Sequence, residues 1–509
     1  MANFGNNNKK YTDMKFKTLL SACLVGISLT SVAQTHEQGI EYYKADQFSN
    51  AKELLTRNLN NAGTDKALSY YYLGQIAIIN KDLNQASKYF EDGIQADPSC
   101  AYNYIGKGLV ALKKGDAKAA ATFMKEAESK GKKDADVLVD IARAYYDADP
   151  VTYAKEIDKR IASASKKQLD NSDLYILEGD MLRDKAIDTQ DQKIYGQAAA
   201  KYDMATGYDP MSSAAYVKYA NMYSDIGNLN YAITKLEELV RNNPNSALGQ
   251  RELANAYYEK NNYSKAAEAY GKYVHNPNHF KDDEDRYAFL LFYDSKFPEG
   301  YAYATQLLNE NPNNFSARRF QFMNAAQMPE LAEQLLPMAN ELWSRHQADP
   351  AKNGFAVIDY NLIADQFSKN GKIDEAITVL NEGIDQNPKY APTFNRTLSD
   401  IWAQAGDYGK AADARIAYVN SLQSPSVNDY YPVAVFAYYG GLQRQNGVTP
   451  GEAQTPFEIN LDDAQKYYDI AIDYANKGLA LDPENANLQA ILNSLTTPAP
   501  DADSQQTQQ

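Results

Sequence analysis

The sequence predicts an all-α protein in which a pair of antiparallel helices recurs along almost the whole chain. Apolar and small residues return in the same order at a spacing of about 34 residues, which is typical of repeat proteins. Within each copy the apolar residues lie three, four and seven positions apart, so they form one face of a helix. Glycines and Xaa-Pro pairs recur between these faces and mark where the helices end.

The repeated pattern begins with an apolar–small pair and closes with a proline. Its clearest copy consists of Tyr219, Ala220, Tyr223, Ala232, Leu236, Leu239 and Pro244. The following copy consists of Leu253, Ala254, Tyr257, Ala266, Tyr270, Tyr273 and Pro277. Tyrosine is common at these positions, so we interpret the 40 tyrosines of the chain chiefly as packing between helices.

Turn residues define both ends of the predicted helices. The first helix of several pairs ends at a glycine that a polar residue follows: Gly115, Gly227, Gly371 and Gly406. Glycine adopts the left-handed conformation that stops a helix at little steric cost. The second helix ends at Asp-Pro or Asn-Pro, because the residue before a proline is driven out of the helical region. These prolines are Pro98, Pro244, Pro312, Pro388 and Pro483.

The pattern resembles the tetratricopeptide repeat, in which Leu-Gly, Tyr, Ala, Phe and Pro stand at the same offsets. The resemblance implies an α-solenoid of about twelve helix-turn-helix units that form a right-handed superhelix. It also implies that the first helices of the units line a concave face, which is the usual binding surface of such proteins.

The repeats divide the chain into four parts. Residues 1–33 are predicted to be an N-terminal extension and cleavable signal peptide. Residues 34–350 hold about nine repeats, of which the last is degenerate. Residues 351–496 hold a second array with an insertion near 441–466. The polar residues 497–509 are predicted to be a disordered tail.

The N-terminal segment has the composition of an export signal. Lys15 and Lys17 precede an apolar run over residues 19–29, which is too short for a membrane span, and small residues up to Ala33 form a cleavage site. Cleavage after Ala33 predicts a periplasmic protein. Alternatively, Cys23 is the lipidated residue of a lipoprotein signal, and the chain is then anchored in the outer membrane.

The charge of the chain argues against nucleic-acid binding. The sequence has 51 Lys+Arg and 66 Asp+Glu, a formal net charge of −15. Residues 1–33 hold four basic residues and one acidic residue, so their removal changes the net charge to −18. A general nucleic-acid binder needs a basic face to neutralise phosphates, and no nucleic-acid partner is therefore expected.

Few residues are available for catalysis or metal binding. Cys100 is the only cysteine after the leader, which rules out a disulfide within the predicted mature chain. His275 and His279 have metal-like spacing, but Pro277 separates them, and the acidic run at 282–285 is typical of a helix start. We find no nucleophile, phosphate-loop or zinc-protease motif, so we expect no enzymatic activity, no cofactor and no metal.

The resemblance also places a partner-binding groove on the first helices. In the best-formed repeats the family's groove positions fall on Asn221, Arg251, Asn255 and Tyr258. In the second and third repeats they fall on Tyr71, Gln75, Tyr102, Ile105 and Leu109. Arg251 and Asn255 match the family's carboxylate clamp in part, but Arg286 stands where asparagine is expected. We therefore expect no receptor for chaperone tails.

These features predict a non-enzymatic scaffold in the bacterial cell envelope that binds a protein or peptide partner, expected to be an envelope protein. Membrane association would come only through that partner or through a lipid at Cys23. The alternative is a glycan-binding outer-membrane lipoprotein that is similar to the SusD-like family. The regularity of the repeats argues against this alternative. So does the small number of tryptophans, since aromatic platforms for sugars favour tryptophan and the chain has only Trp343 and Trp402.

Overall fold

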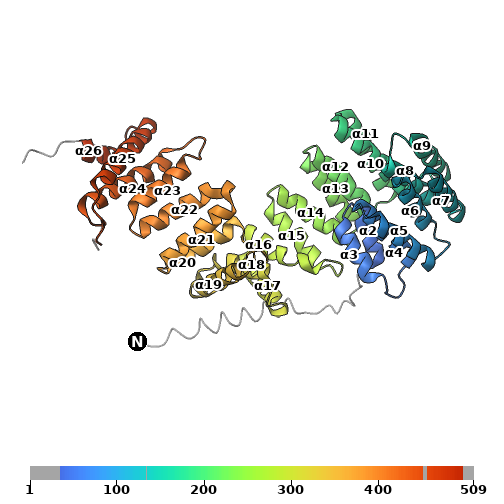
Figure 1. Cartoon of the computed structure of the whole chain (residues 1–509), viewed down its shortest axis with the longest axis horizontal. Helices are drawn as coiled ribbons and strands as arrows, with labels where there is room; N and C mark the ends of the chain where they lie inside the picture. The colour runs from blue at the N-terminus through green and yellow to red at the C-terminus, as the bar shows by residue number, and fades with distance from the viewer. Residues whose placement is uncertain (1–34, 133, 451–454, 497–509) are drawn as a thin grey trace, which may run out of the picture. The chain divides into compact units, whose positions relative to one another are not determined.

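The computed structural model describes residues 35–132, 134–450 and 455–496, and these residues are predominantly α-helical (Figure 1). The predicted all-α solenoid of stacked helix pairs is confirmed. The predicted leader, residues 1–33, and the predicted tail, residues 497–509, lie outside the described residues.

The chain forms two compact units, unit 1 within Met1–Leu290 and unit 2 within Leu291–Gln509, and the boundary falls inside α16 (Asp285–Tyr293). The helices of unit 1 are α2 (His36–Lys44), α3 (Phe48–Asn58), α4 (Lys66–Ile79), α5 (Leu83–Ala96), α6 (Ala101–Lys113), α7 (Ala117–Lys130), α8 (Ala135–Ala148), α9 (Ala154–Lys167), α10 (Ser172–Thr189), α11 (Gln192–Tyr208), α12 (Ser213–Asp225), α13 (Leu229–Asn242), α14 (Ala247–Glu259), α15 (Tyr263–Val274) and the 3-10 turn η1 (Lys281–Asp283).

Unit 2 continues the same alternation of paired helices. Its elements are α17 (Phe297–Glu310), α18 (Phe315–Ala325), η2 (Pro329–Leu331), α19 (Ala332–Ala348), α20 (Val357–Lys369), α21 (Ile373–Gln386), η3 (Pro388–Tyr390), α22 (Ala391–Gln404), α23 (Tyr408–Val419), α24 (Val427–Asn446), α25 (Leu461–Leu481) and α26 (Ala486–Thr496). The predicted division of the arrays after residue 350 falls within unit 2, between α19 and α20.

The predicted turn chemistry is present at both helix ends. The four glycines adopt the left-handed conformation, with φ of 81° at Gly115 and 71° at Gly227. In two of these four turns the following residue caps the next helix: the Asp116 side chain accepts a hydrogen bond from the Ala119 amide, and the Asp407 side chain accepts one from the Lys410 amide. In other repeats a non-glycine residue such as Lys81, with φ of 64°, takes the left-handed position.

The small residues of the repeat allow a large aromatic ring to lie between two backbones. The side chain of Phe90, on α5, is fully buried. A Cβ atom added to Gly74 on α4 would lie 2.3 Å from the ring, and one added to Gly106 on α6 would lie 2.2 Å from it. Glycine is therefore required at both positions, because any larger residue would overlap the ring.

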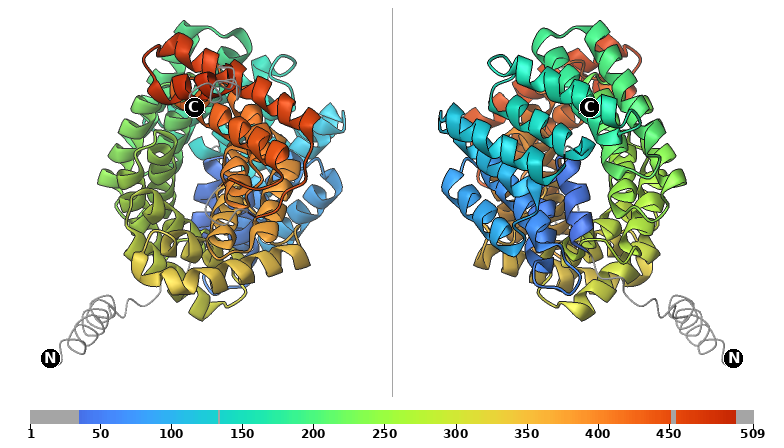
Figure 2. Two further views of the ribbon diagram at one scale, coloured as in Figure 1. Left: turned by 90° about the vertical axis from the view of Figure 1, so that its left-hand side faces the viewer. Right: turned by 90° about the vertical axis from the view of Figure 1, so that its right-hand side faces the viewer.

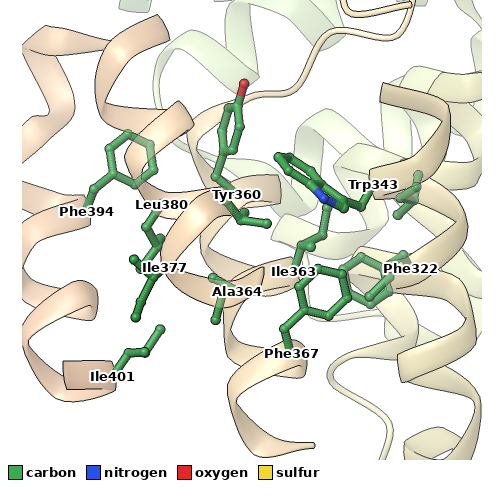
Figure 3. Packing of buried hydrophobic residues seen from close by; sticks show 14 of the residues in the cluster. Phe322, Trp343, Tyr360, Ile363, Ala364, Phe367, Ile377, Leu380, Phe394 and Ile401 are labelled. Carbon is green, nitrogen blue, oxygen red and sulfur yellow. The ribbon is translucent and has the colours of Figure 1, made fainter. Parts of the chain in front are cut away.

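The core of unit 2 forms even where the sequence pattern is degenerate. Segment 315–350 yields the pair α18 and α19, although Pro337 lies inside α19. Figure 3 shows Trp343 of α19 packing beside Phe322 of α18 and the aromatic and aliphatic face of α20. Asp359, at the start of α20, is fully buried and accepts hydrogen bonds from Arg319 and from the Ala356 amide.

Two stretches that are longer than the regular repeat are accommodated mainly as longer helices. The extra residues around 188–193 extend α10 to Thr189, and α11 begins at Gln192. Near the predicted insertion at 441–466, α24 continues to Asn446 and α25 begins at Leu461. The connection between them contains an isolated antiparallel bridge from Val448 to Pro456.

Candidate functional site

The first helices of six consecutive pairs in unit 1 form a closed ring. Each of α2, α4, α6, α8, α10 and α12 contacts the next, and α12 contacts α2. Figure 2 shows these helices, from blue through teal to green, curving around one another in its right-hand view. The concave face of these repeats is therefore enclosed on all sides by helices, rather than forming an open groove.

Charged side chains close the ring between its first and last helices. Lys218 of α12 places its Nζ atom 2.8 Å from Asp46, which follows α2, and 3.3 Å from Asp180 of α10. Lys44, at the end of α2, pairs with Asp173 of α10. The side chain of Lys218 is only 7% exposed, so its charge depends on these carboxylates.

A cavity of about 630 Å³ lies inside the ring. All six ring helices or the turns that follow them contribute to its wall. The residues used below are Tyr43, Asp46, Phe48, Tyr71, Tyr72, Asp140, Arg143, Asp147, Asp173 and Lys218.

One side of the cavity is an aromatic wall. The centroid of the Tyr43 ring lies 5.5 Å from that of Phe48 and 4.9 Å from that of Tyr72. Tyr71 continues the wall, 5.0 Å from Tyr72 and 5.4 Å from Tyr102. Burial raises the pKa of Tyr71 and Tyr72 well above the ordinary value, so both hydroxyls stay protonated.

The facing helix, α8, carries a charged stripe. Asp136, Asp140, Arg143 and Asp147 follow one another at intervals of four, three and four residues, which places them on one face of the helix. Asp140, Arg143 and Asp147 line the cavity. No motif in the sequence marks these residues as a site, although their helical spacing can be read from it.

Three of the five cations that line the cavity form ion pairs with carboxylates of the protein. Arg143 donates from Nη1 to Asp180 at 2.9 Å, and Lys44 and Lys218 hold the ring-closing contacts. In the described part of the chain, no hydrogen bond or ion pair reaches the carboxylates of Asp140 and Asp147. The lining of the cavity holds five cationic side chains (Lys44, Lys81, Lys113, Arg143 and Lys218) and four carboxylates (Asp46, Asp140, Asp147 and Asp173), so its wall is close to neutral.

The two central carboxyls titrate in opposite directions. Burial raises the pKa of Asp140 to about 7, against the lowering effects of Arg143 and Lys44. Burial would also raise the pKa of Asp180, but Lys218 and Arg143 outweigh it and hold that pKa below its ordinary value. Asp180 thus acts as the counter-ion of Lys218 and Arg143, whereas the ionised form of Asp140 is disfavoured because its carboxyl is buried.

Asp140→Asn is expected to raise the melting temperature of unit 1 at pH 8, by about 2–4 °C for each kcal/mol gained. The folded pKa of Asp140, about 7, lies above its unfolded value, so its contribution to stability falls as pH rises toward 7 and is lost above it. The gain should therefore be largest at pH 8 and shrink toward pH 4. Calorimetry of the full chain measures it. Asp158→Asn, on the exposed side of α9, should show no such pH dependence.

A second, open depression of about 700 Å³ lies beside α2 and the N-terminal ends of α8, α10 and α12. Its lining contains one lysine, Lys44, and six acidic residues: Glu37, Glu41, Asp136, Asp170, Asp173 and Asp209. Lys44 and Asp173 line both this depression and the cavity, so their ion pair separates the two spaces.

The groove positions predicted in the second and third repeats have three different surroundings. Tyr71, Gln75 and Leu109 line the cavity. Tyr102 packs behind Tyr71, and Ile105 is fully buried, so it belongs to the core.

The four predicted partner-binding residues lie on α12 and α14, outside the cavity. Asn221 is half-buried on α12. Arg251 pairs with Asp283, from Nε to Oδ2, at 2.8 Å, and Asn255 hydrogen-bonds Glu252. Tyr258 contacts the rings of Tyr263 and Phe289 and the guanidinium of Arg286. Their role in partner binding stays a prediction.

The two histidines with metal-like spacing each contact a different partner. His275 ends α15, and its Nδ1 lies 2.6 Å from the carbonyl oxygen of Gly271. His279 lies 2.6 Å from Glu284, whose hydrogen bond raises the pKa of His279. Among the described residues there is no group of three or more His, Cys, Asp or Glu side chains that could hold a metal ion.

Unit 2 offers a smaller polar depression of about 410 Å³ on α20 and α22. Its walls are bound to each other, since Thr397 donates to Asn361 at 2.9 Å and Ser368 donates to Gln404. None of the helices in the described ranges combines the length and the apolar character that a membrane crossing requires.

Comparison with known proteins identifies the repeats. The family model described as tetratricopeptide repeat matches residues 64–136, 220–278 and 361–418. No curated protein matches the sequence.

Solved structures are similar at low identity. The Cut9–Hcn1 hetero-tetramer of APC/C is 12% identical, with a TM-score of 0.36 over 90% of this chain and 95% of that one. A tetratricopeptide repeat protein from Parabacteroides merdae is 13% identical, with a TM-score of 0.28 over 62% of this chain and 98% of that one. The segments that match the tetratricopeptide repeat model lie in both unit 1 and unit 2.

Proposed function

We propose that the chain is a non-enzymatic scaffold that is exported to the bacterial cell envelope and binds a protein or peptide partner inside unit 1. The observation that carries this proposal is the ring cavity, in which six repeats present aromatic and charged side chains to one enclosed space. Such a concave surface is the usual binding face of repeat proteins. The export signal predicted within residues 1–33 supports the location.

Stored electrostatic strain supports a binding role for the cavity. A half-buried carboxylate without an ion-pair partner lowers the stability of the fold. Residues with this effect are retained where binding requires them. Asp140 is in this situation, whereas the neighbouring Asp180 is fully compensated. A purely structural ring would need Asp180 but not Asp140.

The glycan-binding alternative has weaker support. Trp343 is buried in the core of unit 2 and is 8% exposed, and Trp402 packs against the same core with Lys410 over its ring. Neither tryptophan presents an open face to a sugar. Metabolic labelling with palmitate tests the lipoprotein version separately, because only a chain lipidated at Cys23 would take up the label.

Site-specific photo-crosslinking in the producing cells tests the scaffold. A photoreactive phenylalanine analogue in place of Phe48, at the cavity, is expected to give one discrete adduct with a partner. The same analogue at Tyr258 tests the predicted groove. In place of Tyr231, which is 55% exposed on α13, it serves as the control. Adducts that are as strong from position 231 as from the cavity would contradict binding inside unit 1.

A further inference from the structure

The turn between α15 and α16 packs against the first helix of the ring. We call residues 276–284 of this turn, which include η1, the strap. Phe280 of the strap is buried, and the centroid of its ring lies 5.3 Å, edge to face, from that of Tyr42 on α2. Tyr42 is itself buried. The strap therefore holds a face of α2, the helix that closes the ring through its contact with α12.

One end of the strap is anchored by Asp283. Its carboxylate accepts a hydrogen bond from the Tyr273 hydroxyl at 2.7 Å and pairs with Nε of Arg251 at 2.8 Å. The Tyr273 hydroxyl in turn accepts a hydrogen bond from the Phe280 amide at 2.9 Å. Burial raises the pKa of Tyr273 above its ordinary value, so this anchor keeps its protons near neutral pH.

The other fixed point of the strap is His279. Its Nδ1 lies 2.7 Å from the carbonyl oxygen of Asn276, and its Nε2 lies 2.6 Å from Oε1 of Glu284. Carbonyl and carboxylate oxygens accept hydrogen bonds, so both ring nitrogens have to donate, whereas a neutral imidazole carries a single N–H. The imidazolium is the form that makes both bonds. The side chains of His279 and Glu284 are 16% and 17% exposed, so salt screens their attraction only weakly.

The direction of the pH effect follows from this geometry. The hydrogen bond from His279 to Glu284 raises the pKa of His279 above its ordinary value, although burial acts in the opposite direction. A raised pKa stabilises the structure fully below the ordinary histidine value of about 6.5, and this stabilisation is lost as the pH rises through the raised value. The strap should therefore be held at acidic pH and loosen at alkaline pH.

The charged groups that face His279 come from the strap and from the three helices packed against it. They are Lys281, Asp283 and Glu284 of the strap, Tyr273 of α15, Tyr42 of α2, and Arg251 and Glu252 of α14. Burial raises the pKa of Tyr42 and of Tyr273, so neither hydroxyl loses its proton near neutral pH. Burial also raises the pKa of Glu252, which therefore needs a control of its own.

We propose that the strap is a pH-sensitive device for ring closure, in which the imidazolium of His279, bonded to Asn276 and Glu284, keeps Phe280 seated on α2, and loss of its proton releases Phe280. This proposal concerns the closure of the ring and is independent of whether a partner binds in the cavity.

Fluorine NMR of the full chain tests whether Phe280 leaves its seat. 4-Fluorophenylalanine, incorporated at position 280 only, reports the contact of this ring with Tyr42. We expect one signal from the seated ring at pH 6 and a second, solvent-exposed signal that grows as the pH rises. The ratio of released to seated signal should increase at least about tenfold by pH 9, since one unit of pKa difference corresponds to a factor of ten.

Nitrogen-15 NMR of labelled histidine tests the protonation state itself. The chain has four histidines, and the signals of His279 are identified by their loss in His279→Gln. Both ring nitrogens of His279 should carry protons at pH 6. One proton should be lost with the same midpoint as the change in the fluorine spectrum, because both measurements follow one titration.

Matched variants connect the pH dependence to the bond between His279 and Glu284. Glu284→Gln is expected to abolish it, because a glutamine amide can donate to the neutral imidazole and keeps the strap in place at every pH. His279→Gln should also be independent of pH. His275→Gln, at an exposed histidine four residues earlier, should keep the wild-type pH dependence, and so should Glu252→Gln.

Four results would each overturn the proposal. These are a fluorine spectrum that does not change between pH 6 and pH 9, a single protonated ring nitrogen on His279 at pH 6, an undiminished pH dependence in Glu284→Gln or His279→Gln, and a pH dependence that disappears in Glu252→Gln. The last result would assign the titration to Glu252. Since two variants remove the proposed bond from opposite sides, a folding defect in one of them leaves the other to decide.

Discussion

Lys218→Met is expected to lower the free energy of unfolding of unit 1 by about 3 kcal/mol, because removing one member of a buried ion pair leaves its partners uncompensated. Methionine keeps the aliphatic stem of the side chain but not its charge. Asp180, 13% exposed, would then retain Arg143 as its only cationic partner among the described residues. Asp46 would lose its contact with the ring at the same time.

The loss should appear as a fall in the melting temperature of roughly 6–12 °C for a unit of this size. Hydrogen exchange gives a local readout, since α2 is held against α12 and α10 by Lys218 and Lys44. Amides of α2 are therefore expected to exchange faster in the variant than those of α5, which lies outside the ring.

Lys272→Met is the matched control. Lys272 pairs with Glu268 at 2.9 Å, one helical turn away, and both side chains are more than half exposed. Exposed pairs of this kind contribute less than about 0.5 kcal/mol. If the two lysine variants lost the same stability, the ring would not be closed by the buried charges of Lys218.

Local features of the fold followed from the sequence, whereas the closure of the ring did not. Gly115 and Pro98 act on the residues beside them, so their roles as helix ends could be predicted from a few neighbouring letters. Lys218 and Asp46 are 172 positions apart. Their meeting depends on small rotations that accumulate over six repeats, and no single repeat encodes that sum.

The candidate site could be predicted only in part for the same reason. Tyr71 and Gln75 were placed in the groove by their positions within a repeat, and both line the cavity. Arg251 was placed by the same rule, but Asp283 from the η1 turn neutralises it. The stripe around Asp140 has a helical spacing, yet its meaning depends on which carboxylates find partners across the ring.

Phe90→Ala is expected to destabilise unit 1 by about 3–5 kcal/mol, the usual cost of removing a fully buried aromatic ring. The ring is held between the backbones of α4 and α6 at Gly74 and Gly106. Its loss would therefore leave a cavity at the junction of two successive pairs. Denaturant unfolding of the full chain, followed with a probe in unit 1, measures the change.

The reverse change at the same contact, Gly106→Ala, is expected to cost about 1–3 kcal/mol. The new methyl group would approach within 2.2 Å of the Phe90 ring, and Gly74 prevents the ring from retreating on its other side. Gly196→Ala is the control for backbone effects. Gly196 lies on α11, and a Cβ atom added there would have no neighbouring atom within 4 Å. The substitution should therefore stabilise the helix by up to about 1 kcal/mol.

The double variant of Phe90→Ala and Gly106→Ala decides whether these two effects share one contact. The added methyl group would enter the space that the ring vacates, so the double variant should be more stable than the sum of the single losses by about 1–2 kcal/mol. Additivity within about 0.5 kcal/mol would show that the two residues do not pack directly. Coupling of the expected sign would explain why the repeat pairs a glycine on the first helix with an aromatic residue on the second. A ring that fills the space between two backbones fixes their distance, and the repetition of that distance determines whether six repeats close a ring.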